Sequence, residues 1–260
     1  MVEPNNIYLG DCLEVMKDIP DNSIDAVICD LPYGVLNRNN KDAQWDNIID
    51  IPTLFGEYKR ICKDKAPIVL FGQGMFTAKL MTLNPELWRY NLIWDKAGVT
   101  GFLDANRKPL RCHEDIIVFS KAGYHTYNPQ MERVPLRLKS HNRKGGNNNE
   151  RTNTCYGHIL NVPSELTDEK YPRSIITFSK SSPSERLYHP TQKPIDLIRY
   201  LIRTYSNSDD IILDNTMDSG TTCVAAIMEK RRYIGIEKDE KYFEIAKRRI
   251  EVEKAQLTLF

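Results

Sequence analysis

Apolar residues along the chain follow two alternating patterns. Short apolar runs are typical of buried strands, and apolar positions three or four residues apart are typical of helices. The short runs predict strands over residues 7–9, 26–29, 68–71, 90–94, 115–119, 211–214 and 233–237. The helical period predicts helices over residues 13–19, 53–62, 75–83, 195–204, 221–230 and 240–253. Strands that alternate with helices predict an α/β fold with a mostly parallel sheet covered on both faces, in which the segments at 90–94 and 115–119 are antiparallel neighbours.

The alternation stops between residues 123 and 188. This stretch is rich in Asn, Ser, Pro, Arg and Lys, includes the run Gly145-Gly146-Asn147-Asn148-Asn149, and shows no clear period. Segments of this kind form irregular structure at the surface. We therefore expect a main domain built from residues 1–122 and 189–260, and an irregular insert over residues 123–188.

The composition narrows the class of protein. A chain of 260 residues with 41% hydrophobic and 27% charged residues is typical of a soluble globular protein. No apolar run approaches the roughly 20 residues of a membrane span, and the first ten residues lack a signal-peptide pattern. The six cysteines form no CxxC pair, and the histidines do not cluster. We therefore expect a cytoplasmic protein with no membrane partner, no metal site and no disulfide framework.

Charge is distributed unevenly. The net charge of +1 does not by itself indicate a nucleic-acid binder. Residues 131–151, within the expected insert, nevertheless hold six basic residues against Glu132 and Glu150. The basic residues are Arg133, Arg137, Lys139, Arg143, Lys144 and Arg151. Such a run is either a solvated loop or a surface that contacts phosphate groups, and the sequence leaves both interpretations open.

Residues 211–237 carry the pattern of a nucleotide-binding unit. A predicted strand ends at Asp214, a turn with Gly220 leads into a helix, and the next strand ends in Glu237, 17 residues after that glycine. The turn lets the backbone approach a ligand, and the acid can accept hydrogen bonds from both hydroxyls of a ribose. A dinucleotide site needs G-x-G-x-x-G, whereas this turn has one glycine. A ligand without a pyrophosphate therefore fits better.

Residues 26–34 suit chemistry on an amino group. The predicted strand runs into Asp30-Leu31-Pro32-Tyr33, which supplies a carboxylate, a proline-stiffened turn and an aromatic ring. The carboxylate and nearby carbonyls can accept hydrogen bonds from an amino group while the ring stacks on the heterocycle that carries it. Acceptors that hold both N–H groups aim the nitrogen lone pair at an electrophilic methyl group. A nucleic-acid base must leave its duplex to reach such a site.

Four segments resemble the motifs of amino-methylating DNA methyltransferases. Asp30-Leu31-Pro32-Tyr33 resembles their (D/N/S)PPY motif, and residues 213–222 resemble their cofactor loop D-P-F-x-G-S-G-T-T. Residues 189–194, HPTQKP, resemble the segment that precedes this loop, and residues 8–12 resemble a short GD segment. The order of these motifs is that of the β-class enzymes. The resemblance covers the whole chain except the insert.

The resemblance implies a Rossmann-like, S-adenosylmethionine-dependent methyltransferase fold with permuted motif order and a target-recognition insert. The implied reaction transfers a methyl group from S-adenosylmethionine to N6 of adenine in a base flipped out of DNA. Asp30 and the carbonyl of Leu31 would accept hydrogen bonds from the target amino group. Pro32 would shape the turn, Tyr33 would stack on the base, and the basic run would contact DNA phosphates.

For the cofactor, the resemblance implies that Glu237 holds the ribose and Asp11 the adenine amino group. Lys193, His189 and the turn at 219–222 would surround the methionine end. The implied cofactor residues are Asp11, Cys12, Asp30, His189, Thr191, Lys193, Asp214, Asp218, Ser219, Gly220, Thr221, Thr222 and Glu237.

Departures from the family pattern matter at three positions. Leu31 replaces the first proline, Thr216 replaces a phenylalanine, and Asp218 replaces a glycine. A glycine at such a position often serves a positive φ, which Asp tolerates better than most residues. The added carboxylate of Asp218 could nevertheless weaken binding of a cofactor that carries its own carboxylate.

Other functions stay open. Methylation at N4 of cytosine uses the same geometry on a smaller ring; Asp30 favours adenine because cytosine members of the family more often have Ser there. Asp218 leaves open a cofactor-binding nucleic-acid module that does not methylate. Methylation of RNA, protein or a small molecule has less need of a basic insert. A homodimer and a separate cognate restriction endonuclease are partners that the sequence leaves open.

Overall fold

The computed structural model describes residues 2–34, 47–135, 168–180 and 192–257, together with the backbone of residues 152–153 and 157–158. The chain divides into two compact units, one formed by residues 1–128 with 173–260 and the other by residues 129–172. The first unit holds the main sheet and its helices.

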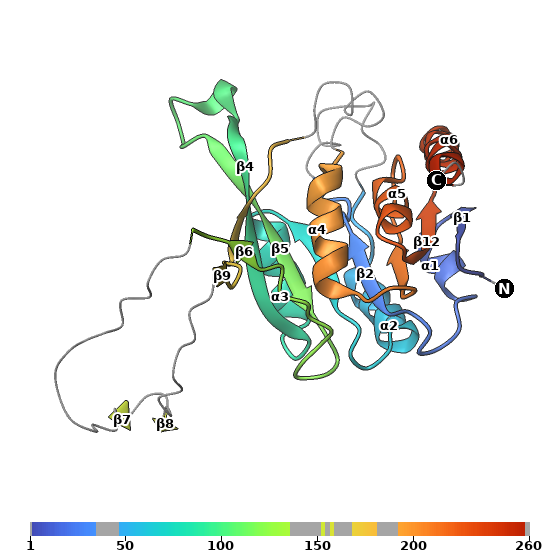
Figure 1. The fold of residues 1–260 in the computed structure, drawn as a ribbon. Helices are drawn as coiled ribbons and strands as arrows, with labels where there is room; N and C mark the ends of the chain where they lie inside the picture. The colour runs from blue at the N-terminus through green and yellow to red at the C-terminus, as the bar shows by residue number, and fades with distance from the viewer. Residues whose placement is uncertain are drawn as a thin grey trace. The chain divides into compact units, whose positions relative to one another are not determined.

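Within the described residues, the first unit forms an eight-stranded sheet in the order β1-β12-β11-β2-β3-β5-β4-β10 (Figure 1). The strands are β1 (Asn6–Leu9), β2 (Ala26–Cys29), β3 (Ile68–Gly72), β4 (Trp88–Thr100), β5 (Arg111–Phe119), β10 (Ile175–Thr177), β11 (Ile211–Asp214) and β12 (Arg232–Glu237). Neighbouring strands are parallel, except that β5 is antiparallel to β3 and β4. The mostly parallel sheet and its antiparallel pair are therefore confirmed.

Helices cover both faces of this sheet. The helices α1 (Cys12–Met16), α2 (Ile51–Ile61) and α3 (Met75–Leu83) pack on one face, and α4 (Ile195–Tyr205), α5 (Thr221–Met228) and α6 (Glu240–Leu257) pack on the other. Successive residues of β2 point to opposite faces, so Val27 joins the first apolar core and Ile28 the second. Burial on both sides explains why these strands read as continuous apolar runs.

Local signals set the ends of two helices. Asp50 caps α2, since its carboxylate accepts a hydrogen bond from the Thr53 N–H at 3.0 Å, and a proline occupies the first turn. This helix begins earlier than predicted. The first helix ends earlier than predicted: α1 stops at Met16, and residues 17–19 form a turn and a bend. Pro20 disfavours helical geometry in the residue before it, so the helix cannot continue to residue 19.

Two features of the sheet differ from the sequence analysis. β4 and β5 are longer than the strands predicted at 90–94 and 115–119. The apolar pattern did not indicate their outer parts, because these parts carry exposed residues. β10 lies within residues 123–188, for which the sequence predicts irregular structure, and it pairs in parallel with β4, with Ile176 opposite Trp94. The assignment of residues 123–188 to target recognition stays a prediction.

The second unit contains short strand pairs. β6 (Glu132–Arg133) is antiparallel to β9 (Glu169–Lys170), and β7 (Thr152–Asn153) is antiparallel to β8 (Gly157–His158). Across both units, the part of the chain that the structure describes holds no helix long and apolar enough to cross a bilayer.

Candidate active site

A cavity of about 810 Å³ opens where β1, β2, β11 and β12 end. Because these strands are parallel, the residues that follow them meet at one edge of the sheet, where open α/β sheets bind ligands. The neighbouring ends of β4 and β5 contribute one side. Among its lining residues are Asp11, Cys12, Asp30, Leu31, Pro32, Tyr33, Trp94, Lys96, Glu114, Lys193, Thr216, Asp218 and Glu237.

Asp30 is the first residue after β2, and hydrogen bonds stabilise the turn formed by Asp30–Tyr33. Its Oδ1 accepts a hydrogen bond from the Tyr33 hydroxyl at 2.9 Å, and the Tyr33 ring lies 4.8 Å from that of Phe76. The Thr216 hydroxyl donates to the Asp30 carbonyl at 2.9 Å. Thr216, which departs from the family pattern, thus ties the Asp30 turn to the Gly220 turn.

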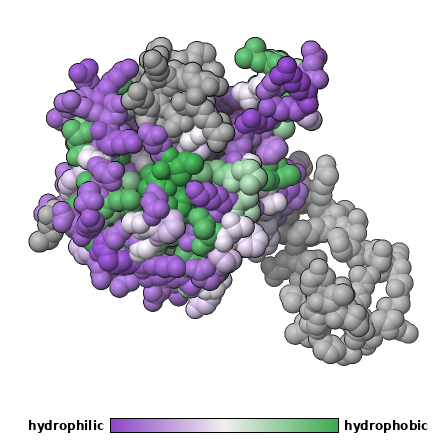
Figure 2. Space-filling view, turned by 180° about the vertical axis from the view of Figure 1, so that it is seen from behind, coloured by the Kyte–Doolittle hydropathy of each residue, from purple (hydrophilic) through white to green (hydrophobic). Residues whose placement is uncertain are grey.

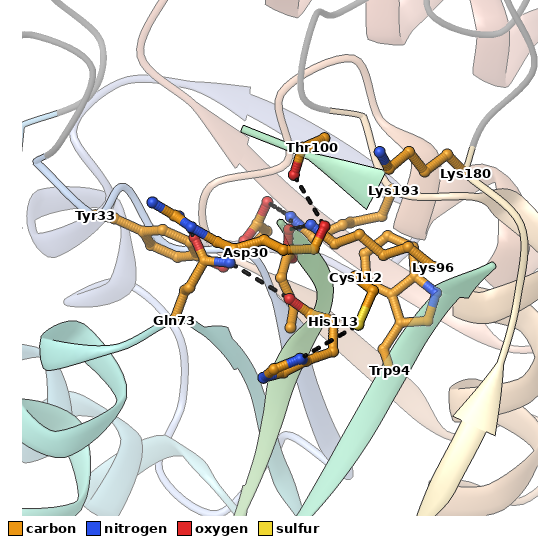
Figure 3. Close-up of polar contacts among 12 residues, drawn as sticks. Asp30, Tyr33, Gln73, Trp94, Lys96, Thr100, Cys112, His113, Lys180 and Lys193 are labelled. Carbon is orange, nitrogen blue, oxygen red and sulfur yellow. Dashed lines mark hydrogen bonds and ion pairs between the residues drawn. The ribbon is translucent and has the colours of Figure 1, made fainter. Parts of the chain in front are cut away.

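Two carboxylates and two ammonium groups form a buried chain of ion pairs, which we call the charge quartet: Asp30, Lys193, Glu114 and Lys96. Lys193 contacts Asp30 Oδ2 and lies 3.5 Å from Glu114 Oε2, while Lys96 pairs with Glu114 Oε1. These side chains are only 9% to 20% exposed. Figure 3 shows Lys96 and Lys193 converging beside Asp30, next to the Tyr33 ring. The quartet is neutral as a whole when all four groups are ionised.

The quartet perturbs the pKa values of its members. Burial raises the pKa of Asp30, and the Lys193 charge only partly opposes this. Burial alone would lower the pKa of Lys193, but the carboxylates of Asp30 and Glu114 raise it well above the ordinary lysine range. Burial would likewise raise the pKa of Glu114, yet Lys193 and Lys96 hold it below its ordinary value. Lys193 therefore keeps its proton at neutral pH.

The sequence pattern did not indicate two members of this quartet. Lys96 and Glu114 come from β4 and β5, and Glu114 lies opposite Trp94 in the strand register. A buried indole accompanies them, since Trp94 donates from Nε1 to the Phe178 carbonyl at 2.8 Å. The available signal was a charged residue within or directly beside an otherwise apolar strand. A pattern of exposed and buried positions does not reveal which partner such a charge meets.

The opposite end of the cavity is built around Glu237, the last residue of β12. Its Oε2 accepts a hydrogen bond from the Asp218 N–H at 3.0 Å, and its Oε1 accepts one from the Asp239 N–H at 2.8 Å. The Gly10 N–H donates to the Glu237 carbonyl at 2.9 Å, which brings the neighbouring Asp11 to the same end. Burial raises the pKa of Glu237, and the backbone donors only partly oppose it.

The turn between β11 and α5 needs two left-handed residues. Gly220 has φ +78°, and an added Cβ there would lie 2.8 Å from the Cβ of Ala246, so only glycine fits. Asp218 has φ 48°, the conformation expected where glycine is usual. Burial raises the pKa of Asp218 well above its ordinary value, and the carboxylates of Glu237 and Asp30 add to this effect.

The remaining described residues of the predicted cofactor set lie beside the main cavity. Asp214, Ser219, Thr221 and Thr222 line a second cavity of about 30 Å³, which shares Asp30, Lys193 and Asp218 with the large one. Gly220 turns the chain into α5. The structure thus brings together Asp11, Cys12, Asp30, Lys193, Asp218 and Glu237 around the main cavity.

Some predicted residues lie outside the described part of the chain. These are His189 and Thr191 of the cofactor set, and Arg137, Lys139, Arg143, Lys144 and Arg151 of the basic run. Arg133 is described and lies exposed in β6, within the second unit. The DNA-contacting role of the basic run stays a prediction.

Known proteins match both the sequence and the fold. A family model described as DNA methylase matches residues 24–248. The chain is 28% identical to the type II methyltransferase M.HinfI of Haemophilus influenzae, over 95% of this chain and 68% of that protein. It is 27% identical to the DNA adenine methyltransferase YhdJ of Escherichia coli (strain K12), over 96% of this chain and 84% of that protein.

Solved structures share the architecture. The M1.HpyAVI–SAM complex superposes with a TM-score of 0.62 and 24% identity, covering 94% of this chain and 98% of that one. The PvuII DNA methyltransferase, described as cytosine-N4-specific, superposes with a TM-score of 0.67 and 16% identity, covering 96% and 87%. Because the matching family model spans most of the chain and includes both ends of the cavity, the chain belongs to the N6/N4 amino DNA methylase family.

Proposed function

We propose that this DNA methylase transfers a methyl group from S-adenosylmethionine to N6 of adenine in a base flipped out of the DNA duplex. The observation that carries the proposal is that one cavity joins the Asp30–Tyr33 turn to Glu237. A methyl donor and an amino acceptor can therefore meet in a single space, which direct transfer between them requires.

The Glu237 end fits S-adenosylmethionine. A cavity of about 810 Å³ is large enough for a nucleoside bearing an amino-acid side arm. The Glu237 carboxylate, held by two backbone N–H groups, is fixed in orientation and can accept from both ribose hydroxyls. Asp11 lines the same end; its Oδ1 accepts a hydrogen bond from the Leu13 N–H at 2.9 Å, and its carboxylate can also accept from the adenine amino group. When bound there, S-adenosylmethionine supplies the electrophilic methyl group.

The Asp30 end fits an exocyclic amino group. Asp30 and the Leu31 carbonyl accept its two N–H groups, which orients the nitrogen lone pair, while Tyr33 offers a ring to the base. Asp30 already accepts from Tyr33 and Lys193, so an arriving amino group competes with an ammonium ion. Glu114 resolves this competition because it lies 3.5 Å from Lys193 and can hold that ammonium when Asp30 turns to the base.

The acceptor residue and the named relatives bear on the choice of base. Asp30 and the relative named as a DNA adenine methyltransferase support adenine. Methylation at N4 of cytosine is the alternative, because a cytosine-N4-specific enzyme shares the fold and the same acceptors suit either amino group. The relatives named as type II methyltransferases support a role in restriction–modification.

We also propose that residues 123–188 recognise the target sequence and that the basic run contacts the DNA phosphates. Support comes from the charge of this stretch and from its separation, in part, into a second unit. Each phosphate contact should contribute a salt-dependent term to DNA affinity.

The proposal is tested by methylation of DNA with the purified full chain and radiolabelled S-adenosylmethionine. The DNA is then digested to nucleosides for mass spectrometry, and long-read sequencing locates the modified sites. We expect N6-methyladenine at one short sequence. N4-methylcytosine would establish the alternative, and an absence of labelled DNA beside measurable cofactor binding would indicate a module that does not methylate.

A further inference from the structure

The β4–β5 hairpin reaches beyond the rest of the sheet. Its last paired residues are Thr100 and Arg111, and residues 101–110 form a tip that projects past the helices (Figure 1). Gly101 turns the chain with φ +93°, and a short 3₁₀ helix, Phe102–Asp104, follows.

The tip presents two large apolar side chains to solvent. Leu103 is fully exposed and Phe102 is 67% exposed. A single exposed apolar residue needs no explanation, but two adjacent ones at the end of a projecting arm are typical of an interaction site. Figure 2 shows apolar surface at this tip, bordered by hydrophilic residues.

The charge around these residues is positive. Residues 101–111 contain Arg107, Lys108 and Arg111 against a single acid, Asp104. The acid lies 2.8 Å from Lys108 and 4.0 Å from Arg107, whose side chain is 84% exposed. An apolar tip with a basic border suits a duplex, whose stacked bases lie between two rows of phosphates.

The same hairpin leads directly into the active site. The cavity is lined by Thr100, Arg111 and His113. Farther from the tip, the same two strands contribute Lys96 and Glu114 to its lining. The hairpin is braced at this level, since Arg111 contacts Gln73 and Lys180 donates to the Val99 carbonyl at 3.2 Å. The tip therefore stands at the rim of the cavity that would receive the base.

We propose that the hairpin tip is a wedge: Phe102 and Leu103 insert into the duplex beside the target and occupy the space that the flipped base leaves. Arg107 and Lys108 then lie against the flanking phosphates. The wedge rests on the proposed function, because only an enzyme that acts on a base inside a duplex needs one. Apolar side chains between base steps replace part of the stacking that flipping destroys.

The test compares matched and premelted substrates. The double variant Phe102→Ser/Leu103→Ser should fold normally, because both side chains are exposed, and its thermal transition is checked first. On a matched duplex carrying the mapped target, we expect kcat/KM to fall about 10- to 100-fold, since unstacking costs a few kcal/mol. On a duplex with the target base mispaired, the loss should shrink to within about threefold, because that base is already destabilised.

Fluorescence of 2-aminopurine at the target position gives a readout that does not require turnover. The parent should raise this fluorescence on binding, and the double variant should not. The variant Val252→Ser removes an exposed apolar residue from α6 and should match the parent in every assay.

Each outcome has a definite meaning. Equal loss on matched and mispaired duplexes, or an unchanged fluorescence rise, would overturn the wedge while leaving methylation intact. A parent enzyme that methylates no DNA would overturn the proposed function, and the wedge with it.

Discussion

The two ends of the cavity hold their carboxylates in different ways. At the end that we propose binds the base, which we call the base end, Asp30 and Glu114 each face an ammonium group. At the end that we propose binds the cofactor, the cofactor end, Glu237 accepts hydrogen bonds from backbone N–H groups. Backbone donors cannot move away, so they fix the orientation of the Glu237 carboxylate. A fixed acceptor suits ribose hydroxyls, which have to bind in a single orientation. Ammonium groups on flexible stems can change partners, which suits a carboxylate that must release one donor to accept another.

The largest effect should follow removal of Asp30. Asp30→Ala deletes the proposed acceptor of the target amino group, so we expect kcat to fall by about 10³-fold, within the range for general acid–base and electrostatic contacts. Cofactor affinity measured by calorimetry should stay close to that of the parent. Asp30→Asn keeps an acceptor oxygen and should retain more activity than Ala. Turnover of Asp30→Ala within a few-fold of the parent would contradict the assignment.

The second prediction concerns how the raised pKa of Asp214, a buried carboxylate outside the quartet, affects stability. Burial raises its pKa from 3.8 to about 6. Between these pH values the folded protein holds a proton that the unfolded chain lacks, so the stability linked to Asp214 is present below about pH 4 and is lost as the pH rises through 6. Asp214→Asn does not titrate there. Relative to this variant, the parent should lose about 2 kcal/mol of unfolding free energy between pH 4 and pH 7. Urea titrations that give a constant difference would exclude this account.

Two variants of Tyr33 distinguish the contribution of its ring from that of its hydroxyl. Tyr33→Ala should lose about 1–3 kcal/mol of base-stacking free energy, seen in kcat/KM for DNA. Tyr33→Phe keeps the ring but removes the hydrogen bond to Asp30, and it should keep most activity. If Phe proved as damaging as Ala, the hydroxyl on Asp30 would be the important group.

Glu114 tests whether ammonium groups change partners. In Glu114→Gln, Lys193 has no second carboxylate in the quartet and stays on Asp30, so we expect kcat to fall about tenfold, equivalent to about 1.4 kcal/mol. KM for the cofactor should not change. The shorter carboxylate of Glu114→Asp should restore part of the rate. A rise in cofactor KM with unchanged kcat would mean that Glu114 serves only the cofactor end.

The smallest effects belong to the cofactor end. Glu237→Gln should weaken S-adenosylmethionine binding by about 1 kcal/mol, because a neutral acceptor replaces a charged one. Asp218→Gly keeps the left-handed turn and removes a carboxylate beside Glu237, so affinity should be equal or tighter. Weaker binding by Asp218→Gly in the same calorimetric titration would identify Asp218 as a ligand contact.

The local patterns of the sequence predicted most of the architecture. The short apolar runs identified the central strands, and the Asp30 and Glu237 positions followed from where those runs end. These inferences succeed because strand and helix periods, prolines and glycines act on neighbouring residues. The conformation of Asp218 could also be expected, because a positive φ is a property of the local backbone.

Only the tertiary structure decided how the charges are paired. Asp30 and Lys193 lie 163 positions apart in the chain, and Glu114 and Lys96 reach them from an antiparallel hairpin whose length the apolar pattern did not show. The strand β10 is likewise defined by its pairing with β4. Sequence periodicity states which side of an element is buried. It does not state which distant element covers that side, so the charge quartet and the projecting tip could be recognised only after the strands were placed in order.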